Sequence, residues 1–214
     1  MTATMTPLRI DIVSDTVCPW CYVGKRHLEA ALAARPHVPV DCHWQPFQLN
    51  PDMPIEGVDR ETHWKQKFGN TDRLAGMVER LKDVGSQLGL AFAFDGITRQ
   101  PNTLKSHALL HHLDGQWDRQ NRLKEDILEG FFISALDIGD DDTLVKLSAG
   151  CGLDEDTCRS ILESDLGPVR EIDEHYRNIG VTGVPTIIFD GKAALVGAQP
   201  PEALIEAIDK FAPA

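Results

Sequence analysis

Two cysteines separated by two residues are the part of the sequence best suited to chemistry. Cys18 and Cys21 follow an alternating apolar run at 8–13. That run predicts a strand, and the Ala- and Leu-rich segment 22–34 predicts a helix. The pair therefore lies where a strand passes into a helix N-terminus, whose unpaired N–H groups and dipole stabilise a thiolate at the first sulfur. Pro19 lacks an N–H and suits a first helical turn.

This spacing is typical of a dithiol that cycles to a disulfide. Cys18 would attack a disulfide partner, and Cys21, one turn deeper, would resolve the mixed disulfide. The alternatives are half of a zinc site or two inert buried thiols. Zinc needs a second ligand pair, and the remaining cysteines form no second CxxC. Of these, Cys42 is expected in the core, whereas Cys151 and Cys158 are either core residues or a second redox pair.

Two further patterns could bind a metal ion. His107 and His111 are four positions apart on one helix face, but no carboxylate lies between them as in HExxH. We interpret them as a partly exposed helix face, with His107 lining the site. The acidic run at 137–142 lacks the Glu-terminated spacing of a calcium loop. We therefore expect no metal.

Composition limits the partners and the compartment. The 214 residues carry a net charge of −12, which disfavours nucleic acid and anionic membranes because both need a basic surface. Residues 1–6 lack the features of a secretory signal, and no apolar run approaches the ~18 residues of a membrane span. We expect a cytoplasmic protein. The sequence leaves the oligomeric state open.

The order of elements predicts an α/β fold. A strand at 38–47 follows the first helix, and a parallel pair with a right-handed crossover is expected. Residues 59–179 are helical in pattern throughout. The last block contains a strand at 186–189, an Asp-Gly turn, a returning strand and a final helix. The domain boundaries predicted from this order are 7–57 with 180–214 for the discontinuous α/β domain and 58–179 for the helical insertion.

A proline precedes the strand that returns to the sheet. In a β-α-β/β-β-α fold, the turn formed by Val184 and Pro185 lies beside the cysteine pair. Proline is tolerated at the start of a strand, and the bond before it could be the uncommon cis form or an ordinary trans turn. We expect Val184 to present its backbone to an extended substrate, and this turn to keep metals off the thiolates.

Several strings of residues resemble one family. They are SDTVCPWCYVGKR at 14–26, WQPFQLNPDMP at 44–54, Asn102-Thr103 with His107, GVPT at 183–186 and VGAQPP at 196–201. Together they resemble the thioredoxin-like DsbA group of thiol–disulfide oxidoreductases and, more narrowly, its FrnE branch. The match covers nearly the whole chain.

The resemblance implies a thioredoxin-like α/β fold (β-α-β … β-β-α) with a large all-helical insertion and a cis bond before Pro185. It implies thiol–disulfide exchange on protein or small-molecule thiols and disulfides. No cofactor is implied beyond the redox-active Cys18–Cys21 disulfide, with glutathione as an optional co-substrate. Trp20 and Tyr22 would form a flat docking surface or pack against the insertion. The residues expected around the sulfurs are Pro19, Trp20, Val184 and Pro185 as substrate contacts, with Asp15, Tyr22 and His107 lining the site.

The sequence departs from thioredoxin at one position that matters. Thioredoxin has a buried carboxylate on the strand below its CxxC, and Ile12 occupies the matching inward position here. Asp11 should face the other way. Asp15 or a water is then left to take the proton of Cys21. The additional C-terminal cysteine pair of a FrnE relative is also missing, since no cysteine follows Cys158.

Two other functions remain as alternatives. Related folds, the 2-hydroxychromene-2-carboxylate isomerases and kappa-class glutathione transferases, bind glutathione at this site with a serine where Cys18 stands. Two cysteines disfavour that interpretation. A non-catalytic holdase that binds apolar peptide strands beside Pro185 is the non-enzyme alternative.

Overall fold

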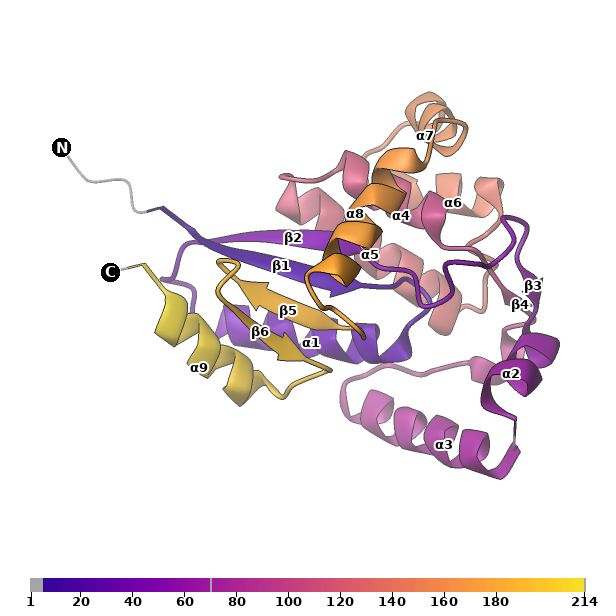
Figure 1. Ribbon diagram of the computed structural model, residues 1–214, viewed down its shortest axis with the longest axis horizontal. Coiled ribbons are helices and arrows are strands. Elements are labelled where there is room, and N and C mark those ends of the chain that lie inside the picture. The colour runs from indigo at the N-terminus through magenta and orange to yellow at the C-terminus, as the bar shows by residue number, and fades with distance from the viewer. Residues whose placement is uncertain (1–5, 70, 214) are drawn as a thin grey trace.

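A four-stranded mixed sheet joins the two ends of the chain (Figure 1). The computed structural model describes residues 6–69 and 71–213. The strands of the sheet are β1 (Leu8–Ser14), β2 (Val40–Pro46), β5 (Thr186–Phe189) and β6 (Ala193–Val196). Their order is β2-β1-β5-β6, with β1 parallel to β2 and antiparallel to β5. The register pairs Ile12 with Trp44 on one side and with Ile187 on the other.

Alternation along β1 decides which helices cover each face. Helices α1 (Pro19–Ala33) and α9 (Pro201–Phe211) lie side by side on one face. Ile10 and Ile12 are buried there with Leu28 of α1 and Leu204 of α9. Residues one position out of phase point to the opposite face, where Val13 packs with residues of α8 and β5.

The segment between β2 and β5 is mainly helical. Its elements are β3 (Val58–Asp59), α2 (Arg60–Phe68), α3 (Thr71–Gln87), β4 (Arg99–Gln100), α4 (Leu104–His112), α5 (Trp117–Phe132), α6 (Asp141–Ser148), α7 (Glu155–Leu162) and α8 (Gly167–Asn178), with 3-10 turns at Phe94–Gly96 and Ala149–Cys151. The short antiparallel pair β3–β4 interrupts the helical pattern, a detail that helical periodicity could not predict. Helices α4, α5 and α8 contact β2, the edge strand of the main sheet.

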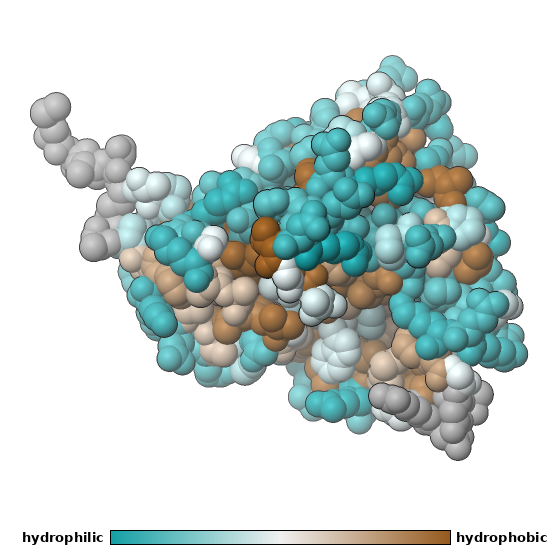
Figure 2. All heavy atoms as spheres, viewed as in Figure 1, coloured by the Kyte–Doolittle hydropathy of each residue, from teal (hydrophilic) through white to brown (hydrophobic). Residues whose placement is uncertain are grey.

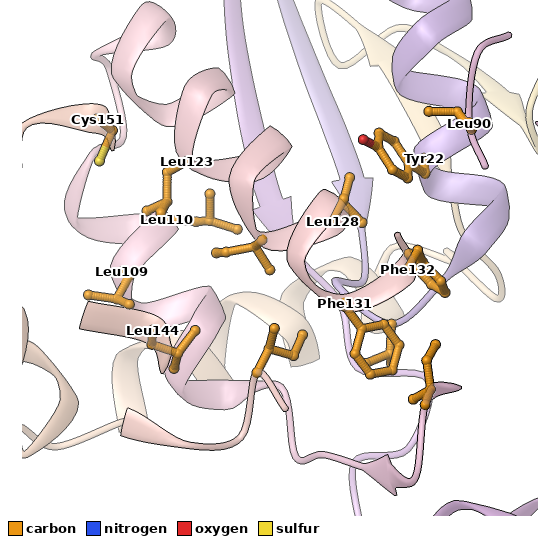
Figure 3. Packing of buried hydrophobic residues seen from close by; sticks show 14 of the residues in the cluster. Tyr22, Leu90, Leu109, Leu110, Leu123, Leu128, Phe131, Phe132, Leu144 and Cys151 are labelled. Carbon is orange, nitrogen blue, oxygen red and sulfur yellow. The ribbon is translucent and has the colours of Figure 1, made fainter. Parts of the chain in front are cut away.

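One large apolar cluster fills the helical segment and continues into the sheet side of the molecule. Leu109, Leu123 and Phe131 are fully buried in it (Figure 3). Tyr22 of α1 belongs to the same cluster and points into it. The start of α1, next to the cysteine pair, is therefore packed against the helical segment.

The thioredoxin-like fold class predicted from the sequence is confirmed. Most elements match their predicted ranges, and α1 extends the predicted helix at 22–34 back to Pro19, the residue expected in a first helical turn. The division at 57/58 and 179/180 stays a prediction. In the described part of the chain, no helix combines the length and apolar character needed to cross a membrane.

The outer surface is mostly polar on the face shown in Figure 2. Figure 2 shows hydrophilic residues over most of the visible face, with apolar ones gathered where the face is hollowed between α9 and α3. The start of α1 and the loop before β5 approach each other nearby (Figure 1). The elements that carry the predicted site thus meet in one region.

The contact between α1 and the loop before β5 requires a glycine. A Cβ on Gly24 would lie 2.9 Å from Cγ of Pro185, which is too close for two rigid groups. Alanine in a helix usually stabilises by about 0.5–1 kcal/mol relative to glycine. We expect Gly24→Ala to destabilise instead, by about 1–3 kcal/mol, because of overpacking.

Urea unfolding of the two proteins measures this difference. Gly76→Ala in α3 is the matched control, because nothing lies within 4 Å of its added Cβ and stabilisation is expected. A stabilised Gly24→Ala protein would contradict the close approach of α1 to Pro185.

Candidate active site

The two cysteines begin α1 at different depths. Cys18 is the N-cap residue and Pro19 the first helical residue, and no acidic side chain occupies the first turn. The backbone N–H of Cys21 donates to the Cys18 carbonyl at 3.0 Å. Cys18 is 4% exposed and Cys21 is fully enclosed. Both carry free thiols, so the structure is that of the dithiol, with the first sulfur nearer the surface.

The loop before β5 meets the first sulfur. The Val184–Pro185 peptide bond is cis, and the Cys18 thiol donates to the Val184 carbonyl at 3.6 Å. Pro185 is buried, whereas Val184 is partly exposed. Segments 166 positions apart are therefore in contact at Cys18.

A cavity of about 240 Å³ opens beside Cys18. Cys18, Pro19, Trp20 and Val184 form one wall, as predicted for substrate contacts. The opposite wall comes from the helical segment and includes Arg60, Trp64, Lys67 and Met77. The cavity thus lies between the start of α1 and helices α2 and α3.

Positive charge is concentrated on the helical wall of this cavity. The Arg60 guanidinium is buried 4.0 Å from the centre of the Trp64 ring and donates to the Gln100 side chain. Burial lowers the pKa of Arg60 to about 10, and burial also lowers the pKa of Lys67. Among the described residues, neither side chain forms a salt bridge with a carboxylate. An anionic group could therefore bind here although the protein as a whole is acidic.

The carboxylate of Asp15, in the loop between β1 and the cysteine pair, is buried and has three hydrogen-bonding partners. Its Oδ1 accepts from Thr16 N at 2.7 Å and lies 3.2 Å from His107 Nε2, while Oδ2 accepts from Leu49 N at 2.8 Å. Burial alone would raise the pKa of Asp15, but hydrogen bonding and charge from His107 and the Leu49 N–H outweigh it and lower the pKa. The carboxylate is therefore held in its ionised form.

Two of the residues expected to line the site are enclosed in the core. The interpretation of His107 as part of a partly exposed face is wrong, since the side chain is 2% exposed and enclosed with Asp15. For Tyr22, the structure confirms packing against the insertion, one of the two alternatives: its ring is buried against Phe92 and Phe132, and its hydroxyl donates to Glu125 at 2.7 Å. In both cases the core behind the site encloses the side chain.

The other candidate residues lie away from the cavity. Cys151 and Cys158 are buried in the helical cluster, and the Cys151 thiol donates to the Ser148 carbonyl. Cys42 is buried under the sheet, where burial raises its pKa to about 12. Within residues 6–69 and 71–213, no group of three or more metal-binding side chains is close enough to hold an ion.

Sequence reasoning missed Lys124, a fully buried lysine of α5 whose ammonium lies 5.1 Å from the centre of the Trp44 ring. The signal was present, because Lys124 lies beside Leu123 and one turn before Leu128 on the buried face of the helix. A lysine at such a position is rarely fully buried without a reason. The helical pattern could not show which charges it would face.

The sheet order, the cysteines at the start of α1 and the facing proline loop define a protein with a thioredoxin-like fold. The family model for the DSBA-like thioredoxin domain matches residues 9–209. The chain belongs to this family of DsbA-like thiol–disulfide oxidoreductases.

Solved structures agree with this assignment. A probable DsbA oxidoreductase from Streptomyces coelicolor is 30% identical, with a TM-score of 0.84 over 95% of this chain and 89% of that chain. The fold is shared by a 2-hydroxychromene-2-carboxylate isomerase (14% identity, TM-score 0.71, 94% and 95% covered). It is also shared by the cytosolic disulfide reductase DsbM from Pseudomonas aeruginosa, solved with GSH (15% identity, TM-score 0.67, 94% and 98% covered).

The donors around Asp15 lead to a pH-dependent prediction. Asp15→Asn keeps one acceptor oxygen but turns an amide N–H toward a donor, so we expect a loss of about 1–3 kcal/mol near pH 7. A carboxyl whose folded pKa is lowered stabilises above its unfolded value of about 3.9, and this contribution is lost as the pH falls through the folded pKa. The difference from wild type should therefore shrink below about pH 4.

Urea unfolding between pH 7 and pH 3 measures this difference. Asp52→Asn, at an exposed position, is the control and should change stability by less than about 0.5 kcal/mol. A difference for Asp15→Asn that stays constant down to pH 3 would contradict the ionised, donor-saturated Asp15.

Proposed function

We propose that the protein is a thiol–disulfide oxidoreductase of the reductase or isomerase type that acts through Cys18 and Cys21. The observation that carries this proposal is the free Cys18 thiol at the N-terminus of α1, against the Val184 carbonyl and beside an open cavity. Its substrates would be protein or small-molecule disulfides. The expected cytoplasmic location would favour reduction or isomerisation over oxidative folding. No further cofactor is needed, and membership of the FrnE branch stays a prediction.

The reaction would proceed in two exchanges. The Cys18 thiolate attacks one sulfur of the substrate disulfide, forms a mixed disulfide and releases the other sulfur as a thiolate. Cys21 then loses its proton and attacks the Cys18 sulfur. The Cys18–Cys21 disulfide forms, and the second substrate thiolate leaves and takes a proton from solvent. The protein dithiol is oxidised by two electrons, and the substrate disulfide is reduced.

The surroundings of Cys18 suit an extended substrate. The partly exposed Val184 could pair its backbone with a bound strand, as peptides add to exposed strand-like segments. Trp20 and Trp64 offer apolar surface on either side of the cavity. Pro19 and Pro185 limit the backbone near the sulfur to fixed conformations.

Cysteine variants test the chemistry directly. Cys18→Ser should reduce insulin at the background rate, because the attacking sulfur is removed. Cys21→Ser should accumulate a mixed disulfide at Cys18, visible by intact mass spectrometry, since the resolving thiol is missing. Cys42→Ser, at a core position, is the control and should retain exchange activity. Equal insulin reduction by wild type and Cys18→Ser would reject the proposal.

The same variants distinguish the alternatives. A glutathione-dependent isomerase or transferase predicts that Cys21→Ser keeps activity on an aromatic substrate when glutathione is added. A holdase predicts that peptide binding survives the loss of both thiols while exchange activity is absent in the wild type. Either result would replace the exchange mechanism.

The cationic wall of the cavity predicts a preference for anionic disulfides. We expect Lys67→Met to raise the KM for glutathione disulfide by about 2–5-fold, as expected for losing one partly exposed ion pair. The KM for the neutral 2-hydroxyethyl disulfide should not change. Lys65→Met is the matched control, because Lys65 lies on the same helix but pairs with Glu61 and does not line the cavity.

Steady-state kinetics with both disulfides at low and high salt measure this preference. An equal rise of KM for the anionic and the neutral disulfide would assign Lys67 a structural role and contradict charge recognition.

A further inference from the structure

A second cavity adjoins the cavity beside Cys18. The two share Arg60, Trp64 and Phe94, but neither cysteine nor Val184 lines the second one. Its other walls include Glu61, Lys65, Leu74, Val78, Asp95 and Ile97, and we call it the α3 cavity. Its volume is about 290 Å³. An apolar protein cavity of about 150 Å³ is large enough to bind benzene, so the α3 cavity has room for a larger group.

The inner walls of the α3 cavity are apolar. Leu74 and Val78 lie one turn apart on α3, and α3 contacts α2 beside it (Figure 1). Phe94 and Ile97, on the segment that follows α3, are buried at the same cavity. Small-molecule sites combine such apolar walls with a few polar groups that fix the orientation of the ligand. The walls therefore favour a ligand with an apolar body.

The polar group of this site is Arg60, which lines both cavities and has unused donors. The side chain is 7% exposed, and its Cζ lies 4.0 Å from the ring centre of Trp64 and 5.6 Å from that of Phe131. Among the described residues, only Nη1 has an acceptor, the Gln100 side chain at 3.1 Å. None of the Arg60 nitrogens is both fully enclosed and unpaired, so the remaining N–H groups border open space at these cavities.

The two carboxylates at the rim of the α3 cavity are paired with lysines and not with Arg60. Glu61 pairs with Lys65, and Asp95 lies 3.4 Å from Lys82. A buried guanidinium without a carboxylate partner is stabilised by an anion that enters the cavity, through charge-assisted hydrogen bonds. Because Glu61 and Asp95 repel multiply charged ligands, a single carboxylate suits this site better than a phosphate.

We propose that the α3 cavity binds a small apolar monocarboxylate, with its carboxylate on Arg60 and its apolar body against Leu74 and Val78. The binding is non-covalent and needs neither cysteine, so the inference does not rest on the proposed function. Since Arg60 and Trp64 also line the Cys18 cavity, a bound carboxylate would occupy a cation on the wall that a disulfide substrate meets.

Isothermal titration calorimetry of the full-length protein with 2-naphthoate tests the charge recognition. The uncharged 2-naphthamide has nearly the same shape. We expect saturable binding of 2-naphthoate and about tenfold or more weaker binding of 2-naphthamide, because only the carboxylate neutralises Arg60. Arg60→Met should weaken 2-naphthoate binding by a similar factor. Arg170→Met, at an exposed position away from the cavity, removes the same charge and should bind like the wild type.

Equal affinity of the wild type for the two probes would overturn the inference, and so would unchanged 2-naphthoate binding by Arg60→Met. The comparison of the probes needs no variant, so it decides even where Arg60→Met does not fold.

Two neighbouring substitutions on α3 locate the bound probe. Met77 and Val78 are both half-buried, but Met77 lines the Cys18 cavity and Val78 the α3 cavity. Val78→Trp should abolish 2-naphthoate binding by filling its site, and Met77→Trp should retain it. The converse pattern, or the same effect of both, would contradict a separate site. Leu74→Trp replaces Val78→Trp if that variant does not fold. Cys18→Ser should bind 2-naphthoate like the wild type, so normal disulfide exchange without binding rejects only this inference.

Discussion

The candidate site depends on the hydrogen bonds that the buried Asp15 carboxylate accepts. A charged group in a closed interior must be matched by donors, and the donors of Asp15 come from segments that are distant in sequence. Thr16 N belongs to its own loop, Leu49 N follows β2, and His107 belongs to α4. Satisfying one carboxylate therefore fixes the end of β1, the proline-rich segment and a helix of the insertion relative to the cysteines.

This constraint explains why the site is built from both parts of the chain. The sheet side contributes the start of α1 and the cis-proline loop, which are in contact through Cys18 and Val184. The helical segment contributes the cationic and aromatic wall and closes the space around the sulfur. The insertion therefore forms part of the candidate site, and its packing against Tyr22 and Val23 of α1 joins both parts in one apolar cluster.

Much of the fold could be predicted from the sequence, because the signals are local. Alternation at 8–13 and the Asp-Gly turn after Phe189 determine strands whatever surrounds them, and Asp190 and Gly191 adopt the positive φ that such a turn requires. The sequence left two orientations open for Tyr22, since periodicity gives a helix face but does not identify the neighbouring element. The cavity wall depends on the approach of α2 to α1, which no local pattern encodes.

Lys124 shows that local sequence patterns also fail to predict where the fold buries a charged side chain. Its position on the apolar face of α5 conflicts with the hydrophobic pattern, and such local conflicts are expected where function outweighs stability. The sequence alone would suggest a lysine that reaches the surface along its aliphatic chain. The side chain does not reach the surface, because Gln120 and Asn121 bind α5 to Trp44 at the edge of the sheet.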